Sequence, residues 1–259
     1  MAEFLEICEQ AARAGGRVLL DWQGRFTARE KGPSDLVTEA DLASQQEVKR
    51  ILLGRYPEHA FVGEEGFGAT PDGYEYRWIV DPLDGTVNYV HGLPNYCVSV
   101  ALEHRGEIVA GTIFVPPTGD CYTAELGRGA WLNGQSITSS GCRELSQALV
   151  AASFPPKTKR GDAELEDFIA VLEECQAIRR FGSAALNLCY VASGRLDGFW
   201  STNIHIWDVA AGLLLVREAG GYVASLSEGP IEMADPKFIS ASTQELFRQL
   251  QHRLPSAHG

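Results

Sequence analysis

Apolar residues at helical spacing open the chain. Over residues 3–22 they recur every three or four positions, which predicts an amphipathic helix that ends near Gly24. Residues 25–38 lack this spacing and are expected to form an exposed loop or hairpin. The helical spacing returns from about Asp41 and stops near Gly54, so a second helix is expected there.

Shorter apolar runs follow and indicate strands. Residues 60–63 and 77–81 are expected to be buried strands, the second of which ends on Asp81 and is followed by a turn. Apolar and polar residues then alternate in the stretch 97–137, where Asn133-Gly134 is typical of a hairpin turn. The middle of the chain therefore predicts a mostly antiparallel sheet.

Strand-like and helix-like segments alternate after about residue 145. The expected strands are 148–153, 177–181, 197–201, 221–225 and 238–241, and the expected helices are 162–176, 183–193, 207–219 and 243–252. This alternation favours an α/β-like second half. We predict an α+β fold in two halves, 1–145 and 146–259, packed as one compact unit.

Charge and composition restrict the class of protein. The chain has 259 residues, with 22 Lys and Arg against 34 Asp and Glu, a net charge of −12. Such a balance disfavours nucleic acid and anionic membranes as partners. The start of the chain carries acids where a signal peptide carries bases, and its longest apolar run, 210–216, is far shorter than the roughly 20 residues that span a bilayer. Six cysteines without a CxxC pair favour reduced thiols, so a soluble, cytoplasmic protein is expected.

Acidic residues gather in three short clusters. Glu64 and Glu65 lie between glycines after an expected strand, Asp81 and Asp84 flank Pro-Leu at the end of another, and Asp208 stands at an expected helix start. Taken alone, the first cluster would be a turn and the third an N-cap. Their chemistry becomes informative only when they are considered together.

Four of these carboxylates suggest a metal site. Glu64, Asp81, Asp84 and Asp208 offer hard oxygen donors, which suit Mg²⁺ or Mn²⁺ rather than zinc. Gly85-Thr86 follows at once and allows a tight turn whose backbone N–H groups can bind phosphate oxygens. No base lies within the clusters to neutralise them, so we interpret them as a phosphate site bridged by divalent cations.

These motifs closely resemble the inositol monophosphatase family, within the lithium-sensitive, magnesium-dependent phosphatases. The matching stretches are Asp35-Leu36-Val37-Thr38 with Asp41, Gly63-Glu64-Glu65, residues 81–92, Leu132-Asn133-Gly134, residues 182–187 and residues 207–212. The similarity covers nearly the whole chain in the order of the family. It implies a layered α-β-α-β-α fold, a homodimer, and a hydrolase for small phosphate monoesters.

The resemblance also implies a set of metal ligands. One ion would be held by Glu64, Asp81 and the backbone carbonyl of Leu83, and a second by Asp81, Asp84 and Asp208. A third, weaker ion would use Glu64 and water. The expected cofactor is therefore two to three Mg²⁺ ions, with Mn²⁺ as an alternative.

Catalytic roles are implied in the same way. The substrate phosphate would rest on the N–H groups of Gly85 and Thr86, and a metal-bound water would attack phosphorus in line. Glu64 and Thr86 would orient and deprotonate this water, with Asp41 linked to Thr86. Lys31 lies in the loop that moves over the site in the family, or is simply a solvated surface lysine.

The residues expected to bind the alcohol part of the substrate differ from the pattern of the family at one position. Many inositol-cleaving members carry a glutamate seven residues before the last metal aspartate, and here that position is Ser201. Ala184 would line the same pocket, and Asp84 and Asp208 would face the substrate as well as the metal. Glu65 is a further possible contact near the loop.

Several alternatives stay open at this point. Inositol-1-phosphate-type esters are favoured, but fructose-1,6-bisphosphate, histidinol phosphate, NADP and 3′-phosphoadenosine-5′-phosphate phosphatases share the fold. The covalent mechanism of haloacid dehalogenases is rejected, because Pro82 occupies the place of their nucleophile. A glycosidase with paired carboxylates is a weaker rival. A catalytically inactive binding or scaffold relative would lack a metal ligand, and none is missing.

Overall fold

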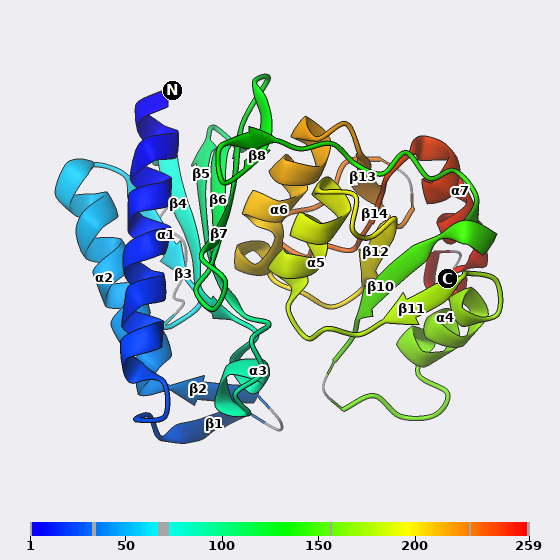
Figure 1. Cartoon of the computed structure of the whole chain (residues 1–259), viewed down its shortest axis with the longest axis horizontal. Coiled ribbons are helices and arrows are strands. Elements are labelled where there is room, and N and C mark those ends of the chain that lie inside the picture. Colours follow the sequence, from blue (N-terminus) through cyan, green and yellow to red (C-terminus); the bar gives the residue numbers. More distant parts are fainter. Residues whose placement is uncertain (1, 33–34, 67–72, 156, 228, 258–259) are drawn as a thin grey trace.

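Helical layers alternate with two sheets along the long axis of the molecule (Figure 1). The computed structural model describes residues 2–32, 35–66, 73–155, 157–227 and 229–257. The order of layers is α1 (Ala2–Trp22) and α2 (Glu39–Arg55), a seven-stranded sheet, α5 (Ala184–Ala192) and α6 (Ile206–Glu218), a five-stranded sheet, then α4 (Ala163–Leu172) and α7 (Gln244–Arg253). This is the expected α-β-α-β-α arrangement, and the predicted fold class is confirmed.

The first helical layer and the first sheet come from the N-terminal part of the chain. The helices are α1 (Ala2–Trp22), α2 (Glu39–Arg55) and the short α3 (Thr86–Val90). The strands are β1 (Ala28–Gly32), β2 (Asp35–Thr38), β3 (Ala60–Gly63), β4 (Tyr76–Asp84), β5 (Cys97–His104), β6 (Glu107–Val115), β7 (Asp120–Glu125), β8 (Gly129–Leu132) and β9 (Gln135–Ser136). β1 and β2 form a separate hairpin, and β3 to β9 form the large sheet in sequence order. Within the part of the large sheet that the structure describes, only β3 and β4 pair in parallel, so the mostly antiparallel sheet is confirmed.

The strand that carries the aspartate motif contains a bulge. β4 does not end at Asp81, as expected from the sequence, but continues to Asp84. Asp81 pairs with Ser99 and Asp84 with Cys97, so three steps on one strand match two on its partner. Paired residues share a face of the sheet, and the extra residue therefore brings both aspartates to the same face.

The second sheet mixes strand directions. Its strands are β10 (Leu149–Ser153), β11 (Ala177–Arg179), β12 (Gly198–Ser201), β13 (Tyr222–Ser225) and β14 (Phe238–Ala241). Their order is β11-β10-β12-β14-β13, with β10 parallel to both neighbours and β14 antiparallel to both of its own. The helices between them are α4 (Ala163–Leu172), α5 (Ala184–Ala192), α6 (Ile206–Glu218) and α7 (Gln244–Arg253).

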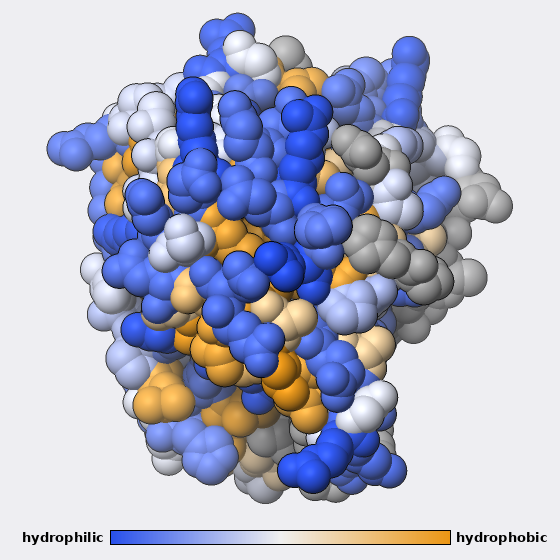
Figure 2. All heavy atoms as spheres, turned by 90° about the vertical axis from the view of Figure 1, so that its right-hand side faces the viewer, coloured by the Kyte–Doolittle hydropathy of each residue, from blue (hydrophilic) through white to orange (hydrophobic). Residues whose placement is uncertain are grey.

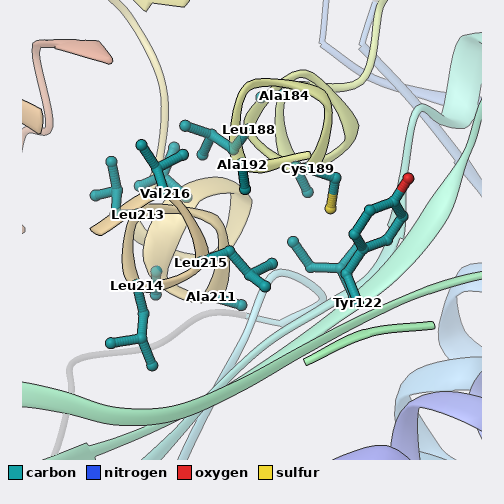
Figure 3. Packing of buried hydrophobic residues seen from close by; sticks show 14 of the residues in the cluster. Tyr122, Ala184, Leu188, Cys189, Ala192, Ala211, Leu213, Leu214, Leu215 and Val216 are labelled. Atoms are coloured by element: carbon teal, nitrogen blue, oxygen red, sulfur yellow. The ribbon is translucent and has the colours of Figure 1, made fainter. Parts of the chain in front are cut away.

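The two central helices are buried on nearly all sides. Figure 3 shows α5 and α6 side by side, with Tyr122 of β7 directed at Cys189. A side chain at Gly212 would collide with Leu188, so glycine permits this close helix contact. A helix that is apolar all round belongs in a core. Helix α6 packs against β6 of the first sheet and against β13 of the second, so these contacts do not separate the chain into two units. The division at residue 145 stays a prediction.

The outer face made by the C-terminal layer is largely hydrophilic, with apolar side chains grouped towards its lower part (Figure 2). Ile169 and Leu172 of α4 are the large apolar residues of that helix that remain exposed. The cysteines, all within the described ranges, are free thiols. Among the described residues, no helix has the length and apolar character needed to cross a bilayer.

Candidate active site

Three aspartates from distant parts of the chain meet at one point. Asp81 and Asp84 come from the bulged end of β4, and Asp208 comes from the first turn of α6. One carboxylate oxygen from each lies within 4.8 Å of the other two. Asp81 and Asp84 are buried, whereas Asp208 is partly exposed. The structure thus brings together three of the four carboxylates proposed as metal ligands.

Local hydrogen bonds hold the bulge in shape. The Leu83 N–H donates to Asp81 Oδ1 at 2.9 Å, and the Ser44 hydroxyl of α2 donates to the carbonyl of Pro82 at 3.0 Å. Proline has no N–H to offer a neighbouring strand, so it is tolerated within a sheet at a bulge. The Asp-Pro-Leu-Asp order therefore favours the bulge that aligns the two aspartates.

Asp84 is held by the start of α5. The Ser183 hydroxyl donates to Asp84 Oδ2 at 2.6 Å, and the N–H groups of Ala184 and Ala185 donate to its two oxygens at 3.2 and 2.7 Å. The positive end of a helix stabilises such an anion. The sequence analysis missed Ser183 and Ala185, although a serine directly before an apolar run is a typical helix N-cap.

Asp208 combines two roles. It is the third residue of α6, and its Oδ2 accepts the His205 N–H at 2.8 Å, as in a capping box. The N-cap residue is therefore His205 and not Asp208, which caps the helix start from the third position and also reaches the aspartate cluster. Trp207 beside it is buried and stacks on His205 at 4.7 Å.

The two glutamates lie just beyond β3. The Glu64 N–H donates to the carbonyl of Val80 at 3.2 Å, which sets it next to β4. The negative charge of Glu64 raises the pKa values of all three aspartates. Gln45 bonds to both the N–H and the carbonyl of Glu65, at 3.0 and 2.6 Å, and so fixes this turn against α2.

Asp41 and Thr86 form a second polar chain. Asp41 Oδ2 accepts the N–H and the hydroxyl of Thr38 at 2.8 and 2.6 Å, in the capping box of α2. The Thr86 hydroxyl lies 3.4 Å from Asp41 Oδ1 and 3.1 Å from the carbonyl oxygen of Leu83. The contact between Asp41 and Thr86 that the resemblance implies is thus present.

The electrostatics of the cluster fit a cation. Burial, followed by the charges of Glu64, Asp208 and Asp84, holds the pKa of Asp81 well above its usual range. Burial, then Asp84 and Glu64, raises the pKa of Asp208 to about 8. Burial also raises the pKa of Asp84 to about 6, although its bonds to α5 oppose the shift. Carboxylates this close cannot all ionise alone, whereas a divalent ion would stabilise the ionised forms.

A pocket of about 520 Å³ opens beside the aspartates. Its walls contain the predicted residues Asp84, Gly85, Thr86, Ala184 and Asp208. They also contain residues that the sequence analysis did not assign, namely Val87, Asn88, Ser153, Phe154, Arg180, Phe181, Gly182, Asn203 and Ile204.

Two further predicted substrate contacts, Ser201 and Lys31, are not among the described residues that line the pocket. Ser201 is fully buried, its hydroxyl has no hydrogen-bond partner among the described residues, and its strand neighbour Ser153 lines the pocket instead. The backbone of Lys31 lies in β1, but its side chain is outside the described part of the structure. Contact between either residue and a substrate stays a prediction.

The layered fold and the clustered aspartates, beside a pocket walled by Asp84-Gly85-Thr86, are the arrangement expected of a metal-dependent hydrolase of phosphate monoesters. The model of the inositol monophosphatase family matches residues 1–256. This chain belongs to that family, and its recognition from the sequence motifs is confirmed.

The chain is similar to proteins that carry several different names. Inositol-1-monophosphatase of Rhizobium meliloti (strain 1021) is 43% identical over 205 residues, covering 78% of this chain and 77% of that protein. The fructose-1,6-bisphosphatase/inositol-1-monophosphatase of Aquifex aeolicus (strain VF5) is 38% identical over 239 residues, covering 91% and 90%. The crystal structure of extragenic suppressor protein suhB from Bartonella henselae superimposes with a TM-score of 0.92, at 38% identity and 98% coverage of both chains.

Proposed function

We propose that this protein hydrolyses the phosphate ester of a small sugar or polyol, of the inositol-1-phosphate type, with two to three Mg²⁺ ions. The observation that carries the proposal is the meeting of Asp81, Asp84 and Asp208 beside a pocket walled by Gly85 and Thr86. The family membership and the name of the Rhizobium relative support this substrate class. The same likeness supports a homodimer as the assembly.

The acidic residues of the site have the oxygen donors needed to bind the metal ions that family membership implies. Glu64, Asp81 and the carbonyl of Leu83 would hold one ion, and Asp81, Asp84 and Asp208 a second. Bound divalent ions would polarise the phosphoryl group and lower the pKa of a water molecule. Hard carboxylate oxygens with raised pKa values in a buried site are suitable donors for such ions.

The polar chain beside the cluster would orient the attacking water. The Thr86 hydroxyl can donate a hydrogen bond to Asp41 Oδ1, which leaves a lone pair on Thr86 Oγ1 to accept a hydrogen bond from that water. Glu64 would then take the proton as a general base. Asp84, held by Ser183, would keep its position while the ester is cleaved.

A direct assay tests this function. Phosphate release from inositol 1-phosphate and glycerol 2-phosphate is measured in Mg²⁺ and in EDTA, for the natural protein and for Asp81→Asn. We expect release that requires Mg²⁺ and is lost in the variant. Release that persists in EDTA would exclude the metal mechanism, and no release from either ester in Mg²⁺ would exclude the function.

A further inference from the structure

One basic side chain lies in the wall of the catalytic pocket. Among the described residues that line it, Arg180 is the only base, and Asp84 and Asp208 are the only acids. Both acids belong to the metal cluster. The rest of the wall is neutral and partly aromatic, with Phe154 and Phe181. A positive charge thus stands in the part of the pocket that no metal ligand occupies.

The guanidinium of Arg180 is held in place but not neutralised. Its Cζ atom lies 4.6 Å from the centroid of the Phe154 ring, and Nη2 donates to the carbonyl of Phe154 at 3.3 Å. It forms no ion pair with any residue that the structure describes, and the side chain is exposed. An arginine has five N–H donors, so most of them remain for a ligand. Stacking on a ring restricts the guanidinium before a ligand arrives.

The backbone that carries this arginine is tied to the active site. The carbonyl of the next residue, Phe181, accepts the side-chain amides of Asn88 and Asn95 at 2.8 and 3.1 Å. Two residues further on, Ser183 bonds to the metal-ligand candidate Asp84 at 2.6 Å. The segment is therefore fixed to α3 at one point and to the aspartate cluster at another, so the backbone that carries Arg180 has a set position relative to that cluster.

The predicted substrate contact Ser201 adds no charge to this part of the pocket. Its side chain is uncharged and fully buried, and it is not among the described residues that line the pocket. Arg180 is therefore the one charged side chain of the described pocket wall that is not a candidate metal ligand.

We propose that Arg180, stacked on Phe154, forms a second anion subsite, and that the alcohol released from the ester carries its own phosphate or carboxylate group. This inference rests on the proposed phosphatase function and narrows its substrate class. Guanidinium groups bind phosphate and carboxylate through paired, charge-assisted hydrogen bonds. A pocket of about 520 Å³ has room for a sugar with two such anionic groups.

Matched substrate pairs test the subsite. Fructose 1,6-bisphosphate is compared with fructose 1-phosphate, and 3-phosphoglycerate with glycerol 3-phosphate, by kcat/KM in Mg²⁺. We expect at least about a tenfold preference for the ester with two anionic groups in one of the pairs, because a hydrogen bond to a charged group is strong enough to change affinity by that factor. The pair that shows the preference tells whether phosphate or carboxylate is recognised.

Two glutamine variants make the test specific to this side chain. Arg180→Gln should reduce the preference at least about tenfold, mainly through KM. The neighbouring Arg179 bonds to the carbonyl of Ile178 and does not line the pocket, so Arg179→Gln removes the same charge and should keep the preference. The subsite would be overturned if both variants lost the preference equally. It would also be overturned if the natural protein preferred the esters with a single anionic group.

Calorimetry separates the subsite from the phosphatase function. If none of the four esters releases phosphate in Mg²⁺, the proposed function fails. The subsite is then judged by binding alone, since fructose 1,6-bisphosphate should bind the natural protein at least about tenfold more tightly than it binds Arg180→Gln. Equal binding to both proteins would refute it.

Discussion

The hydroxyl of Ser183 lies 2.6 Å from the carboxylate of Asp84, although 99 positions separate the two residues in the chain. The same hydroxyl accepts the N–H of Leu186 at 3.3 Å and so caps α5. One side chain thus joins the start of the core helix α5 to the aspartate cluster at the end of β4. Stability and metal binding are coupled at this serine.

Ser183→Ala should weaken both properties. Loss of the cap is expected to cost about 1 kcal/mol of unfolding free energy, and loss of the bond to Asp84 should lower Mg²⁺ affinity by about 10–100-fold. Thermal unfolding and the Mg²⁺ dependence of activity would measure the two effects. Ser193→Ala is the matched control, because that hydroxyl bonds to Cys189 at the other end of the same helix. An unchanged Mg²⁺ requirement in Ser183→Ala would contradict the coupling.

Asp208→Asn should stabilise the metal-free protein at pH 8. The pKa of Asp208 is raised to about 8 in the fold, so the folded chain binds more protons than the unfolded chain between about pH 4 and pH 8. The free energy of unfolding therefore falls as pH rises through that window. Asparagine does not ionise and can still accept the His205 N–H.

The size of this effect can be measured by denaturant unfolding in EDTA. We expect a gain of at least about 1 kcal/mol at pH 8, or about 2–4 °C in Tm for a chain of this size, and a much smaller gain at pH 4. Asp235→Asn alters an exposed aspartate paired with Lys237 and serves as the control. A gain that is equal at both pH values would rule out ionisation as its cause.

Metal binding should release protons and weaken in acid. Asp84, with a pKa raised to about 6, and Asp208, with a pKa raised to about 8, must lose their protons before they can hold a cation. Mg²⁺ affinity should therefore drop by at least about tenfold between pH 8 and pH 6. Calorimetry in buffers of different ionisation enthalpy would count the released protons. Binding that shows no buffer dependence would mean that the carboxylates are ionised before the metal arrives.

The hydroxyl of Thr86 should be needed for turnover rather than for folding. Thr86→Ala removes the group that lies between Asp41 and the pocket, and kcat should fall by about 10²–10⁴-fold. Thr86→Ser keeps the hydroxyl and should retain most of the activity. Comparing kcat and Tm for the two variants separates chemistry from stability. Similar kcat values for serine and alanine would remove Thr86 from the mechanism.

Local sequence predicted most of the elements. The expected helices and strands match the structure to within a few residues, because apolar spacing reports which face of an element is buried. The extension of β4 through Pro82 to Asp84 was not expected, since proline usually ends a strand. The bulge, together with the bond from Ser44, allows that exception.

Ser201 is a residue whose place in the pocket could not be predicted from its spacing along the chain. Its distance from Asp208 suggested a pocket residue by comparison with the family. In the sheet it pairs with Ser153 at the end of β10, and of this pair only Ser153 reaches the pocket. Which of two paired residues lines a pocket depends on the order of the strands and on the layer packed over them, neither of which one sequence contains.

The sequence by itself determined the chemistry of the site. Asp81, Asp84, Gly85 and Thr86 are neighbours in the chain, so their donor types and backbone freedom could be recognised without a fold. Only the tertiary structure decided what surrounds them. Ser183 against Asp84 and Arg180 against Phe154 are contacts between residues far apart in the chain. The first exists because the start of α5 packs against the end of β4, and the second because β10 and β11 pair side by side and bring the residues that follow them together. Packing and strand order of this kind depend on the whole core rather than on any short motif.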